Sequence, residues 1–575
     1  MKINSFIPRV RIIFVCIAFF SALLVVRLYF LQIVKGDAFN DKADRQYTSL
    51  SSNLFDRGGI FFTTKKGSLV SAATLKTGYT IAINPKNITD VEGTYKKLSE
   101  LLKIDPAVFY SKALKKDDPY EEIEKRVTED VVKKISEQNI PGVIIEKDKW
   151  RYYPGDTLAS RLIGFVGYNE DKLEGRYGLE KYYEDVLKRD NSDLYVNVFA
   201  EIFSNINKSF IQDKKTEGSI VTTIDPEVEG YLKKSLEATN KKWDSKITGG
   251  IVIDPNTGEI YAMDVTPSFN LNDFSDEKDL SVFSNPIISS AYEMGSVMKP
   301  ITMSSGIDSG AINAASTWTD YGFVELSGKK ITNVDKKPRG LSSMQDILNH
   351  SMNTGTTYIM QKMGKQKLAE YFQKFGLGTE TGIDLPNEAA GDMSNLKSPR
   401  ELEYATASFG QGISMTPINI TRAFSAIANG GKLITPHVVK TIDYEVGFSK
   451  KISYVNEAQQ IIKKETADEV TRMLINLVDT ALIQGRYKMQ HYSVAAKTGT
   501  AQIARSASQG GGYYEDKFLH TFFGYFPAYN PRFLVFLFTL EPSKANTIFA
   551  SNTLSDPFFD IVKFLINYYE ISPDR

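Results

Sequence analysis

The sequence has 575 residues, of which 42% are hydrophobic and 24% are charged, so it is long and apolar enough to form two or more folded domains. Its 69 basic and 69 acidic side chains cancel, and this balance gives no reason to expect nucleic acid or an acidic polymer as a partner. The single cysteine, Cys16, excludes an intrachain disulfide and, outside its own apolar N-terminal stretch, a cysteine nucleophile.

The first predicted element is a membrane-spanning helix at residues 12–34. This stretch is almost entirely apolar, and its 23 residues would reach about 34 Å, enough for a hydrocarbon core about 30 Å thick. A cleaved signal peptide is the alternative, but Arg27–Leu31 offers no small-x-small cleavage site where one would be expected. We therefore expect a cytoplasmic tail at residues 1–11, a single-pass anchor in the cell membrane, and the rest of the chain outside the cytoplasm.

Residues 35–225 mix short helices and strands and contain no group of residues suited to nucleophilic catalysis. Apolar positions at helical spacing predict two helices here, and a short apolar run after a Pro-Gly pair predicts a strand. The residues that support these predictions are Tyr95, Leu98, Leu101 and Leu102 for the first helix, Val131, Val132 and Ile135 behind Thr128 as N-cap for the second, and Val143–Ile145 for the strand. We predict a non-catalytic module.

The remaining chain begins with a predicted helical linker at 226–248 and a hairpin at Gly249–Met263, in which two apolar runs flank a Pro-Asn-Thr-Gly turn. Helical stretches then surround a few strands, among them Phe533–Thr539, and the last predicted helix, Phe558–Tyr569, is apolar enough to pack on that sheet. We therefore predict that residues 249–575 form an antiparallel sheet covered by helices, and that the fold class is α+β.

Three short motifs follow one another in this second region. Ser296 and Lys299 are three residues apart, so one helical turn brings the lysine amine within reach of the serine hydroxyl, as a serine nucleophile with a lysine base requires. Ser351-Met352-Asn353 comes 55 residues after Ser296, and Lys497-Thr498-Gly499-Thr500 comes 146 residues after Ser351, in a strand-like stretch. Each motif alone is weak evidence, but this ordered set occurs once in the chain.

The ordered set resembles the serine acyltransferases that react with penicillin. Further segments are similar to class B penicillin-binding proteins: Arg57–Ile60, Arg151–Pro154, Gly178–Glu180 with Tyr182, Phe375–Gly378, Thr381–Pro386, Phe409–Ile413 and Thr416-Pro417. The resemblance implies a monofunctional peptidoglycan D,D-transpeptidase that is inhibited by β-lactams. In this family an elongated pedestal or dimerisation-type domain, here 35–225, precedes the transpeptidase domain. Phe62–Lys65 departs from the family pattern, which has an Asp-Arg pair there, and Met294 stands where the family usually has proline.

The resemblance also implies roles for the motif residues. Ser296 would form an acyl-enzyme with a stem peptide and release its terminal D-Ala. Lys299 would accept the serine proton, provided that burial and the nearby charge of Lys497 lower the pKa of Lys299. Ser351 would pass the proton to the leaving nitrogen, and Asn353 would hold Lys299 and the substrate amide.

The strand motif would complete the site. By resemblance, the backbone N–H groups of Ser296 and Thr500 would form the oxyanion hole, and Lys497 with the Thr498 and Thr500 hydroxyls would bind the terminal carboxylate. Gly499 inside a strand indicates that a ligand backbone approaches closely there, such as a peptide paired along the strand edge. Pro300 directly after the catalytic lysine disfavours regular α-helix, which predicts a tightened first turn at the serine.

Other functions remain open at this stage: a β-lactamase, a β-lactam sensor, or a catalytically inactive cell-wall scaffold. We expect no metal or other cofactor, since the four histidines, His350, His437, His491 and His520, are never paired at metal-ligand spacing. The expected partners are stem peptides, β-lactams, a membrane-embedded glycosyltransferase and other division or elongation proteins, but no nucleic acid. Ser351–Gly355 and Gly382–Pro386 look closer to the cell-division type of the family than to the elongation type.

Overall fold

The computed structural model describes a few single positions before residue 28 and then residues 55–170, 172–189, 217–275, 277–445, 447–505, 508, 510–545 and 549–575. The predicted membrane span therefore lies outside the described residues, apart from isolated positions. Within the described ranges, none of the helices combines the length and apolarity needed to cross a membrane.

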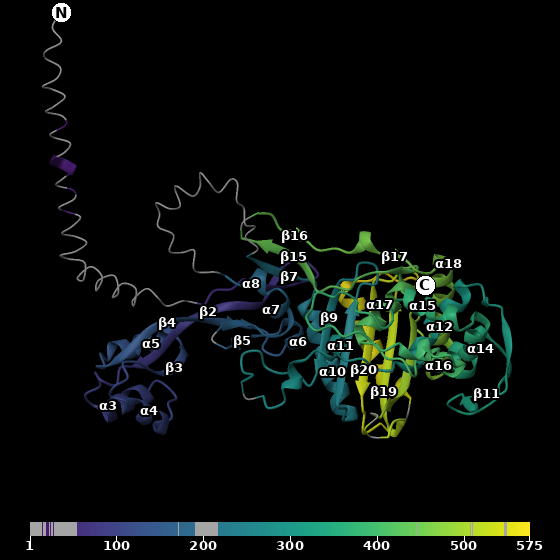
Figure 1. Ribbon diagram of the computed structural model, residues 1–575, viewed down its shortest axis with the longest axis horizontal. Coiled ribbons are helices and arrows are strands. Elements are labelled where there is room, and N and C mark those ends of the chain that lie inside the picture. The colour runs from purple at the N-terminus through teal and green to yellow at the C-terminus, as the bar shows by residue number, and fades with distance from the viewer. Residues whose placement is uncertain are drawn as a thin grey trace, which may run out of the picture. The chain divides into compact units, whose positions relative to one another are not determined.

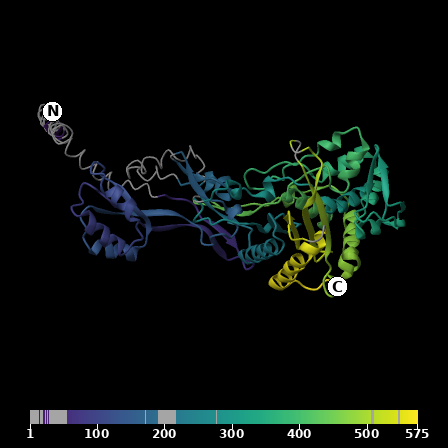
Figure 2. The same ribbon diagram turned by 90° about the horizontal axis from the view of Figure 1, so that it is seen from below.

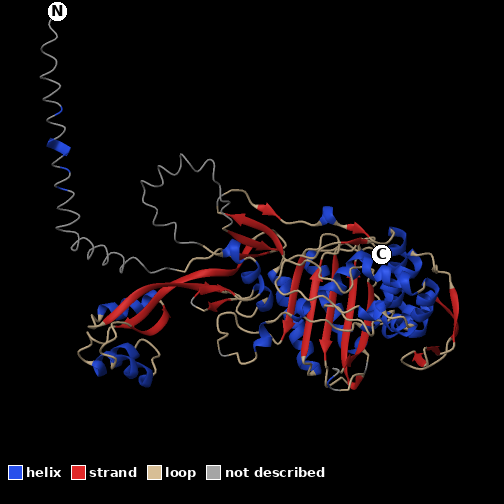
Figure 3. Cartoon of the chain, in the orientation of Figure 1, coloured by secondary structure: helices blue, strands red, loops and turns tan. Residues whose placement is uncertain are grey.

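The chain divides into two compact units, and part of the predicted pedestal belongs to each. The first unit holds residues 76–150 together with the positions before Arg57, and the second holds 57–75 and 151–575. Figure 1 labels the elements and Figure 3 separates helices from strands.

The first unit has its own small apolar core. Its elements are the distal part of β2 (Leu69–Ile83), α3 (Val91–Ser99), α4 (Pro106–Ala113), β3 (Glu121–Val127), α5 (Glu129–Glu137) and most of β4 (Val143–Tyr152). The core contains Ile81, Ile83, Leu98, Phe109, Val127 and Ile135, all buried. The two helices and the strand predicted here are confirmed, although α3 ends before Leu101 and Leu102, and the Thr128 side chain makes no capping hydrogen bond to α5.

In the second unit, one sheet contains strands from both predicted regions, 35–225 and 249–575. Within this unit its strands run in the order β16-β15-β7-β1-β2, and β2 enters with its first residues, 69–75. The strands not yet given are β1 (Ile60–Thr63), β7 (Gly218–Thr222), β15 (Val439–Tyr444) and β16 (Lys450–Lys451). Because β15 comes from the later region and pairs with β7 over five residues, the two regions share backbone hydrogen bonds.

Three of the segments singled out by resemblance meet in this unit at one buried carboxylate. Glu180 lies in α7 (Gly178–Tyr182) and has no exposed surface. Its two carboxylate oxygens accept hydrogen bonds from Arg57 Nε and Arg151 Nε, each at 2.6 Å, and the Tyr153 hydroxyl donates to it at 3.2 Å. Arg57 also pairs with Glu184 at 2.6 Å. The three segments therefore form one buried ion cluster, which a linear sequence does not reveal.

The second sheet of this unit has five antiparallel strands in the order β18-β19-β20-β8-β9. Their bounds are β8 Ile247–Ile253, β9 Ile260–Thr266, β18 Ala495–Ala504, β19 Tyr513–Phe526 and β20 Phe533–Leu540. The predicted hairpin is thus β8 and β9, the predicted late strand is β20, and β18 is an edge strand. The predicted α+β class with an antiparallel sheet covered by helices is confirmed.

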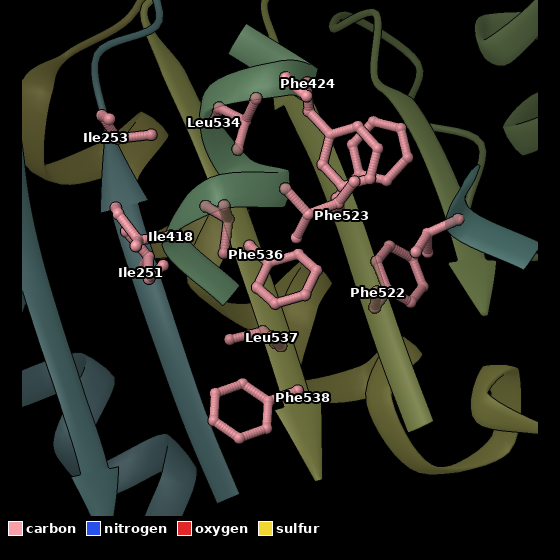
Figure 4. Packing of buried hydrophobic residues seen from close by; sticks show 14 of the residues in the cluster. Ile251, Ile253, Ile418, Phe424, Phe522, Phe523, Leu534, Phe536, Leu537 and Phe538 are labelled. Carbon is pink, nitrogen blue, oxygen red and sulfur yellow. The ribbon is translucent and has the colours of Figure 1, made fainter. Parts of the chain in front are cut away.

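Helices cover both faces of this sheet, and aromatic side chains fill the interfaces. On one face, Phe424 of α17 (Pro417–Ala428) stacks on Phe523 with ring centroids 3.7 Å apart (Figure 4). On the other face, Phe558 of the C-terminal helix stacks on Phe522 at 4.3 Å. Figure 2 shows this last helix, in yellow, along the sheet. The predicted linker helix is α10 (Pro226–Trp243), which also packs on this second face.

The C-terminal helix, α19, begins at Ala550 rather than at Phe558, and it runs to Tyr569. The predicted start is wrong because the helix continues through Pro557, a residue type that usually marks a helix boundary. A proline in a helix removes one backbone hydrogen bond, yet the turns on both sides of it bury apolar side chains against the sheet, among them Leu554 and Phe558. Burial of that face outweighs the local cost of the proline.

The other elements of the second unit are short helices, strands and loops around these sheets. Their bounds are α6 Ser160–Ile163, β5 Val166–Asn169, β6 Lys172–Gly175, α8 Glu184–Leu187, α11 Pro286–Ser289, β10 Thr317–Asp320, β11 Phe323–Leu326, β12 Lys329–Thr332, β13 Gly340–Ser343, α15 Lys365–Lys374, α16 Glu401–Ala407 and α18 Lys464–Asn476.

Candidate active site

Ser296 lies in a 3₁₀ turn, η4 (Gly295–Met298), that leads directly into α12 (Lys299–Asp308). The tightened turn that Pro300 predicts is therefore confirmed. Residues three apart eclipse one another in a 3₁₀ turn, so Ser296 and Lys299 are placed on the same side of this segment. Ser296 is half-buried, whereas Lys299 is fully buried.

The Lys299 amine contacts only neutral oxygens. Its Nζ donates to Asn353 Oδ1 at 2.8 Å, to Ser351 Oγ at 3.1 Å, and to the Ser351 carbonyl oxygen. Burial, and then the charge of Lys497, hold the pKa of Lys299 well below its usual value of 10.5. The lysine is therefore able to exist as a neutral amine in the folded protein, as the sequence requires of a base.

Ser351 occupies the turn between α13 (Met344–Asn349) and α14 (Asn353–Met363), and its backbone is left-handed with a φ of 52°. A left-handed serine costs about 1 kcal/mol or more, so the surroundings must fix this conformation. The buried side chain of Met352 follows it, and Asn353 Nδ2 donates to the Thr332 carbonyl at 3.0 Å. Strain of this kind, stored beside a lysine amine, is typical of functional sites.

Lys497, on β18, reaches the same serine from the other side. It is 3% exposed, and its Nζ donates to Ser351 Oγ at 3.2 Å and to the Thr498 carbonyl at 2.9 Å. Burial lowers the pKa of Lys497 to about 7. The structure thus brings Lys299, Ser351, Asn353 and Lys497 into one network, with the Ser351 hydroxyl between two amines. Within the described part of the chain, no hydrogen bond joins Ser296 Oγ to Lys299.

The pleat of β18 sends its motif side chains to alternate faces of the sheet. Lys497 and Gly499 face the side of η4, because a Cβ on Gly499 would lie 2.8 Å from the Met294 carbonyl oxygen and 2.4 Å from Thr521 Oγ1. The space that the missing side chain leaves is therefore filled by the protein itself. On this face the turn that carries Ser296 approaches Gly499, and the predicted pairing of a peptide along the strand edge stays a prediction.

Thr521 is a site residue that the sequence does not reveal. It is paired with Gly499 across β18 and β19, is fully buried, and its Oγ1 donates to the Met294 carbonyl at 3.1 Å. The glycine and the threonine act together: one leaves the space, and the other uses it to bind the backbone that precedes the Ser296 turn. Only the strand register, which local sequence does not give, pairs these two positions.

Thr498 and Thr500 point toward the opposite face, where α19 packs. Both are half-buried, and Thr500 Oγ1 accepts a hydrogen bond from the Ala550 N–H at 3.1 Å. One lone pair of this hydroxyl is therefore occupied before any substrate binds, while its proton is left to donate elsewhere.

Comparison with known proteins agrees with this fold over nearly the whole chain. Residues 248–560, more than half of the chain, match the family described as "Penicillin binding protein transpeptidase domain", and residues 57–222 match the "Penicillin-binding Protein dimerisation domain". The chain is 28% identical to "Stage V sporulation protein D" of Bacillus subtilis, over 97% of this chain and 85% of that protein. It is 27% identical to "Peptidoglycan D,D-transpeptidase FtsI homolog" of Mesostigma viride, over 98% and 96%.

A solved structure is similar as well. Penicillin binding protein 3 from Mycobacterium tuberculosis, complexed with aztreonam, aligns with a TM-score of 0.65 and 25% identity, over 75% of this chain and 92% of that one. The fold and the matched domains define a serine acyltransferase of the type that reacts with penicillin. The chain belongs to the penicillin-binding proteins, in the class B form in which a dimerisation-type domain precedes the transpeptidase domain. It is a peptidoglycan D,D-transpeptidase of cell-wall synthesis.

Proposed function

We propose that Ser296 is the nucleophile that attacks the D-Ala-D-Ala amide of a stem peptide, and that Lys299 is the base that takes its proton. The observation that carries this assignment is the fully buried Lys299 amine, which has three neutral oxygen partners and a pKa far below that of a free lysine. A catalytic hydrogen bond between Ser296 and Lys299 would then form when substrate binds, as is common for sites that are loose without their ligand.

The proton path follows from the number of N–H bonds. A neutral Lys299 has two, which suffice for the Asn353 side chain and the Ser351 carbonyl, and its lone pair is free to face a hydroxyl proton. After Lys299 has taken the Ser296 proton, the Ser351 hydroxyl, 3.1 Å from Lys299 Nζ, would pass a proton to the leaving D-Ala amine. The acyl-enzyme then remains on Ser296 until the amine of a second stem peptide attacks it.

The edge strand β18 supplies the substrate-binding part of the proposal. A stem peptide would pair along this edge, with its scissile oxygen at the N–H groups of Ser296 and Thr500. One oxyanion-hole donor contributes roughly 3–4 kcal/mol to transition-state stabilisation. The terminal carboxylate would bind Lys497 and the hydroxyls of Thr498 and Thr500, and Gly499 would keep the strand close to the serine turn.

The test is covalent labelling with a fluorescent penicillin, followed by intact-mass measurement. The wild-type protein should form a long-lived adduct on Ser296, and Ser296→Ala, which removes a single oxygen, should form none while keeping the wild-type melting temperature. An adduct on the alanine variant would refute the assignment. Rapid turnover of the adduct would instead indicate a β-lactamase, and the absence of any wild-type adduct would indicate an inactive scaffold.

We propose further that residues 1–11 are cytoplasmic and that residues 12–34 anchor the chain in the cell membrane. A separate, membrane-embedded glycosyltransferase would make the glycan strands that this protein cross-links. A transpeptidase cannot polymerise glycan, so a partner must supply that activity. The boundaries 35–225 for the pedestal, 226–248 for the linker and 249–575 for the catalytic domain belong to this proposal. Replacing residues 12–34 by an unrelated span should abolish co-purification with the polymerase; unchanged co-purification would restrict docking to residues 36–225.

The cell-division role is proposed in preference to elongation. The motif Ser351–Gly355 resembles the division type, and a relative named as an FtsI homolog aligns over almost its whole length. Depletion of the protein should therefore give long cells without septa. Rounded cells that still divide would assign the protein to elongation instead.

A further inference from the structure

A chain of hydrogen bonds on the α19 face of the sheet ends at Thr500, the last residue of the strand motif. His520 of β19 lies directly opposite Thr500 of β18 in the strand register. Its ring is fully buried, and its Nδ1 is 2.8 Å from Thr553 Oγ1 in α19. The Thr553 hydroxyl lies 3.1 Å from the Ala550 carbonyl oxygen, and the Ala550 N–H donates to Thr500 Oγ1, also at 3.1 Å.

The direction of each proton in this chain follows from the chemistry of the groups. A carbonyl oxygen only accepts, so the Thr553 hydroxyl donates to Ala550 and its lone pair receives the Nδ1–H of His520. Burial lowers the pKa of His520 to about 4, so the ring is neutral at physiological pH and Nδ1 carries its one proton. Nε2 has no hydrogen-bond partner in the described ranges, so the side-chain bond that orients this ring is the one to Thr553.

The consequence for Thr500 is a hydroxyl with a fixed direction. Because the Ala550 N–H occupies one of its lone pairs, the Thr500 proton cannot point at that N–H. Thr500 is half-buried on an edge strand, so its proton is left to face the open side of β18. A hydroxyl held as a donor binds an anionic oxygen more strongly than a neutral one.

We propose that His520 and Thr553 are positioning residues for substrate specificity: they hold the first turn of α19 against β18, so that Thr500 presents its proton to the terminal carboxylate of the peptide. The proposal rests on the function proposed above for β18. It adds two residues from outside the three sequence motifs, and it assigns them to discrimination of the carboxylate and not to bond cleavage.

The experiment compares two peptide substrates that differ only at the C-terminus, one with a free D-Ala carboxylate and one with the carboxamide. Second-order acylation rates are measured for both with wild-type protein, Thr553→Val and Thr553→Ser. Thr553→Val, which keeps the shape but lacks the hydroxyl, should reduce the carboxylate-to-carboxamide rate ratio about tenfold. Thr553→Ser, which keeps the hydroxyl, should retain the wild-type ratio. Equal loss of both rates, with or without lower stability, would overturn the proposal, because a merely structural residue affects both substrates alike.

His520 provides a second pair of variants. His520→Asn places an amide donor near the position of Nδ1 and should keep most of the ratio, whereas His520→Leu should lower it as Thr553→Val does. If both variants leave the ratio unchanged, His520 has no part in specificity and the proposal is overturned.

Thr500→Val distinguishes this inference from the proposed function on which it rests. If Thr500→Val lowers the ratio and Thr553→Val does not, only the positioning role fails. If wild-type protein shows no preference for the carboxylate, or if Thr500→Val leaves the preference unchanged, the proposed binding of the carboxylate by Thr500 fails, and the inference fails with it.

Discussion

Two places in the second unit bury a pair of cations, and they differ in what lies between the cations. In the pedestal segments, Arg57 and Arg151 both bind the carboxylate of Glu180, at 2.6 Å each. In the catalytic region, Lys299 and Lys497 both contact the Ser351 hydroxyl, at 3.1 and 3.2 Å, and their other partners are neutral oxygens. Burial is nearly complete in both places, so burial alone does not explain the difference in chemistry.

The counter-ion decides the protonation states. Burial disfavours the charged form of Glu180, but the charges of Arg151 and Arg57 outweigh it and hold the pKa of Glu180 below its usual value. Glu180 therefore stays charged at neutral pH, between the two guanidinium groups. With no carboxylate between them, Lys299 and Lys497 have lowered pKa values, and an amine that loses its proton near neutral pH is available for proton transfer.

The largest effect is expected where the geometry demands a neutral amine. Lys299→Arg introduces a guanidinium that stays protonated, so it should lower the penicillin acylation rate by roughly 10²–10⁴-fold, the usual contribution of a general base. Lys497→Arg should lose less, because the role proposed for Lys497 needs positive charge and a donor. Stopped-flow acylation of both variants measures this difference. Equal rates would show that the two lysines are not distinguished in the way we propose.

The next effect concerns stability. Glu180→Gln leaves two buried guanidinium groups without their shared carboxylate, and breaking such a buried ion pair costs about 3–5 kcal/mol. The matched control is Glu184→Gln, because the Glu184 side chain also pairs with Arg57 at 2.6 Å but is 25% exposed, so its loss should cost much less. Thermal unfolding of the two variants measures the difference. Similar melting temperatures would contradict the view that Glu180 holds the cluster together.

Much of the structure around these two places was predictable from the sequence, where it depends on residues close together in the chain. The spacing of Ser296 and Lys299, the position of Pro300 and the turn before β9 act within a few residues, so they predicted the tightened turn and the hairpin correctly. The three pedestal segments were recognised one by one, but their convergence on Glu180 depends on contacts between residues 27 to 123 positions apart.

What the sequence did not reveal depends on strand register. Gly499 was interpreted through its own strand, whereas the side chain that uses its space belongs to Thr521, one strand away. The link from His520 to Thr500 likewise needs both the register of β18 and β19 and the true start of α19. That start lies before Pro557, which is inside the helix. The burial of apolar side chains that outweighs the proline is visible only in the tertiary structure.

The comparison also predicts a dependence on pH. Since the pKa of Lys497 is about 7, this lysine is charged below that pH and loses its charge as the pH rises through it, so acylation by a carboxylate substrate should fall above pH 7. In Lys497→Arg the fall should move to much higher pH. A rate profile between pH 6 and 9 measures this, and an unchanged fall in the arginine variant would contradict the assignment.

The Glu180 cluster should not contribute to that profile. The pKa of Glu180 is lower in the folded state than in the unfolded state. The stabilisation from Glu180 is therefore complete above its unfolded-state pKa and is lost only as the pH falls through its folded-state pKa. Melting temperatures recorded across pH 6 to 9 serve as the control for the rate measurements. A fall in melting temperature that matched the fall in rate would attribute the profile to unfolding.

The smallest effect is expected at a third buried cluster, in which acidic side chains outnumber basic ones. Glu229 of α10 and Asp264 of β9 are both buried, and each has one carboxylate oxygen without a hydrogen-bond partner in the described ranges. Lys233 lies 3.8 Å from Asp264, farther than the ion pairs of the Glu180 cluster. Burial raises the pKa of Asp264 to about 6, whereas burial lowers the pKa values of Lys299 and Lys497, so in all three cases the neutral form is favoured.

The sign of the expected pH effect follows from proton uptake. Between the unfolded pKa of Asp264 and about 6, the folded state holds a proton that the unfolded state has lost, so stability falls as the pH rises through this window, by at most about 3 kcal/mol. Asp264→Asn keeps the oxygen that accepts the Val265 N–H at 2.8 Å and removes the titration. Its melting temperature should therefore be less sensitive to pH between 5 and 7 and should exceed that of the wild type at pH 7.5. Glu237→Gln, which changes the half-exposed partner of Lys233, is the control and should keep the wild-type slope. If Asp264→Asn also keeps the wild-type slope, the Asp264 carboxylate is not protonated in the folded protein. The rule that the counter-ion decides whether a buried group is charged would then fail for a buried acid.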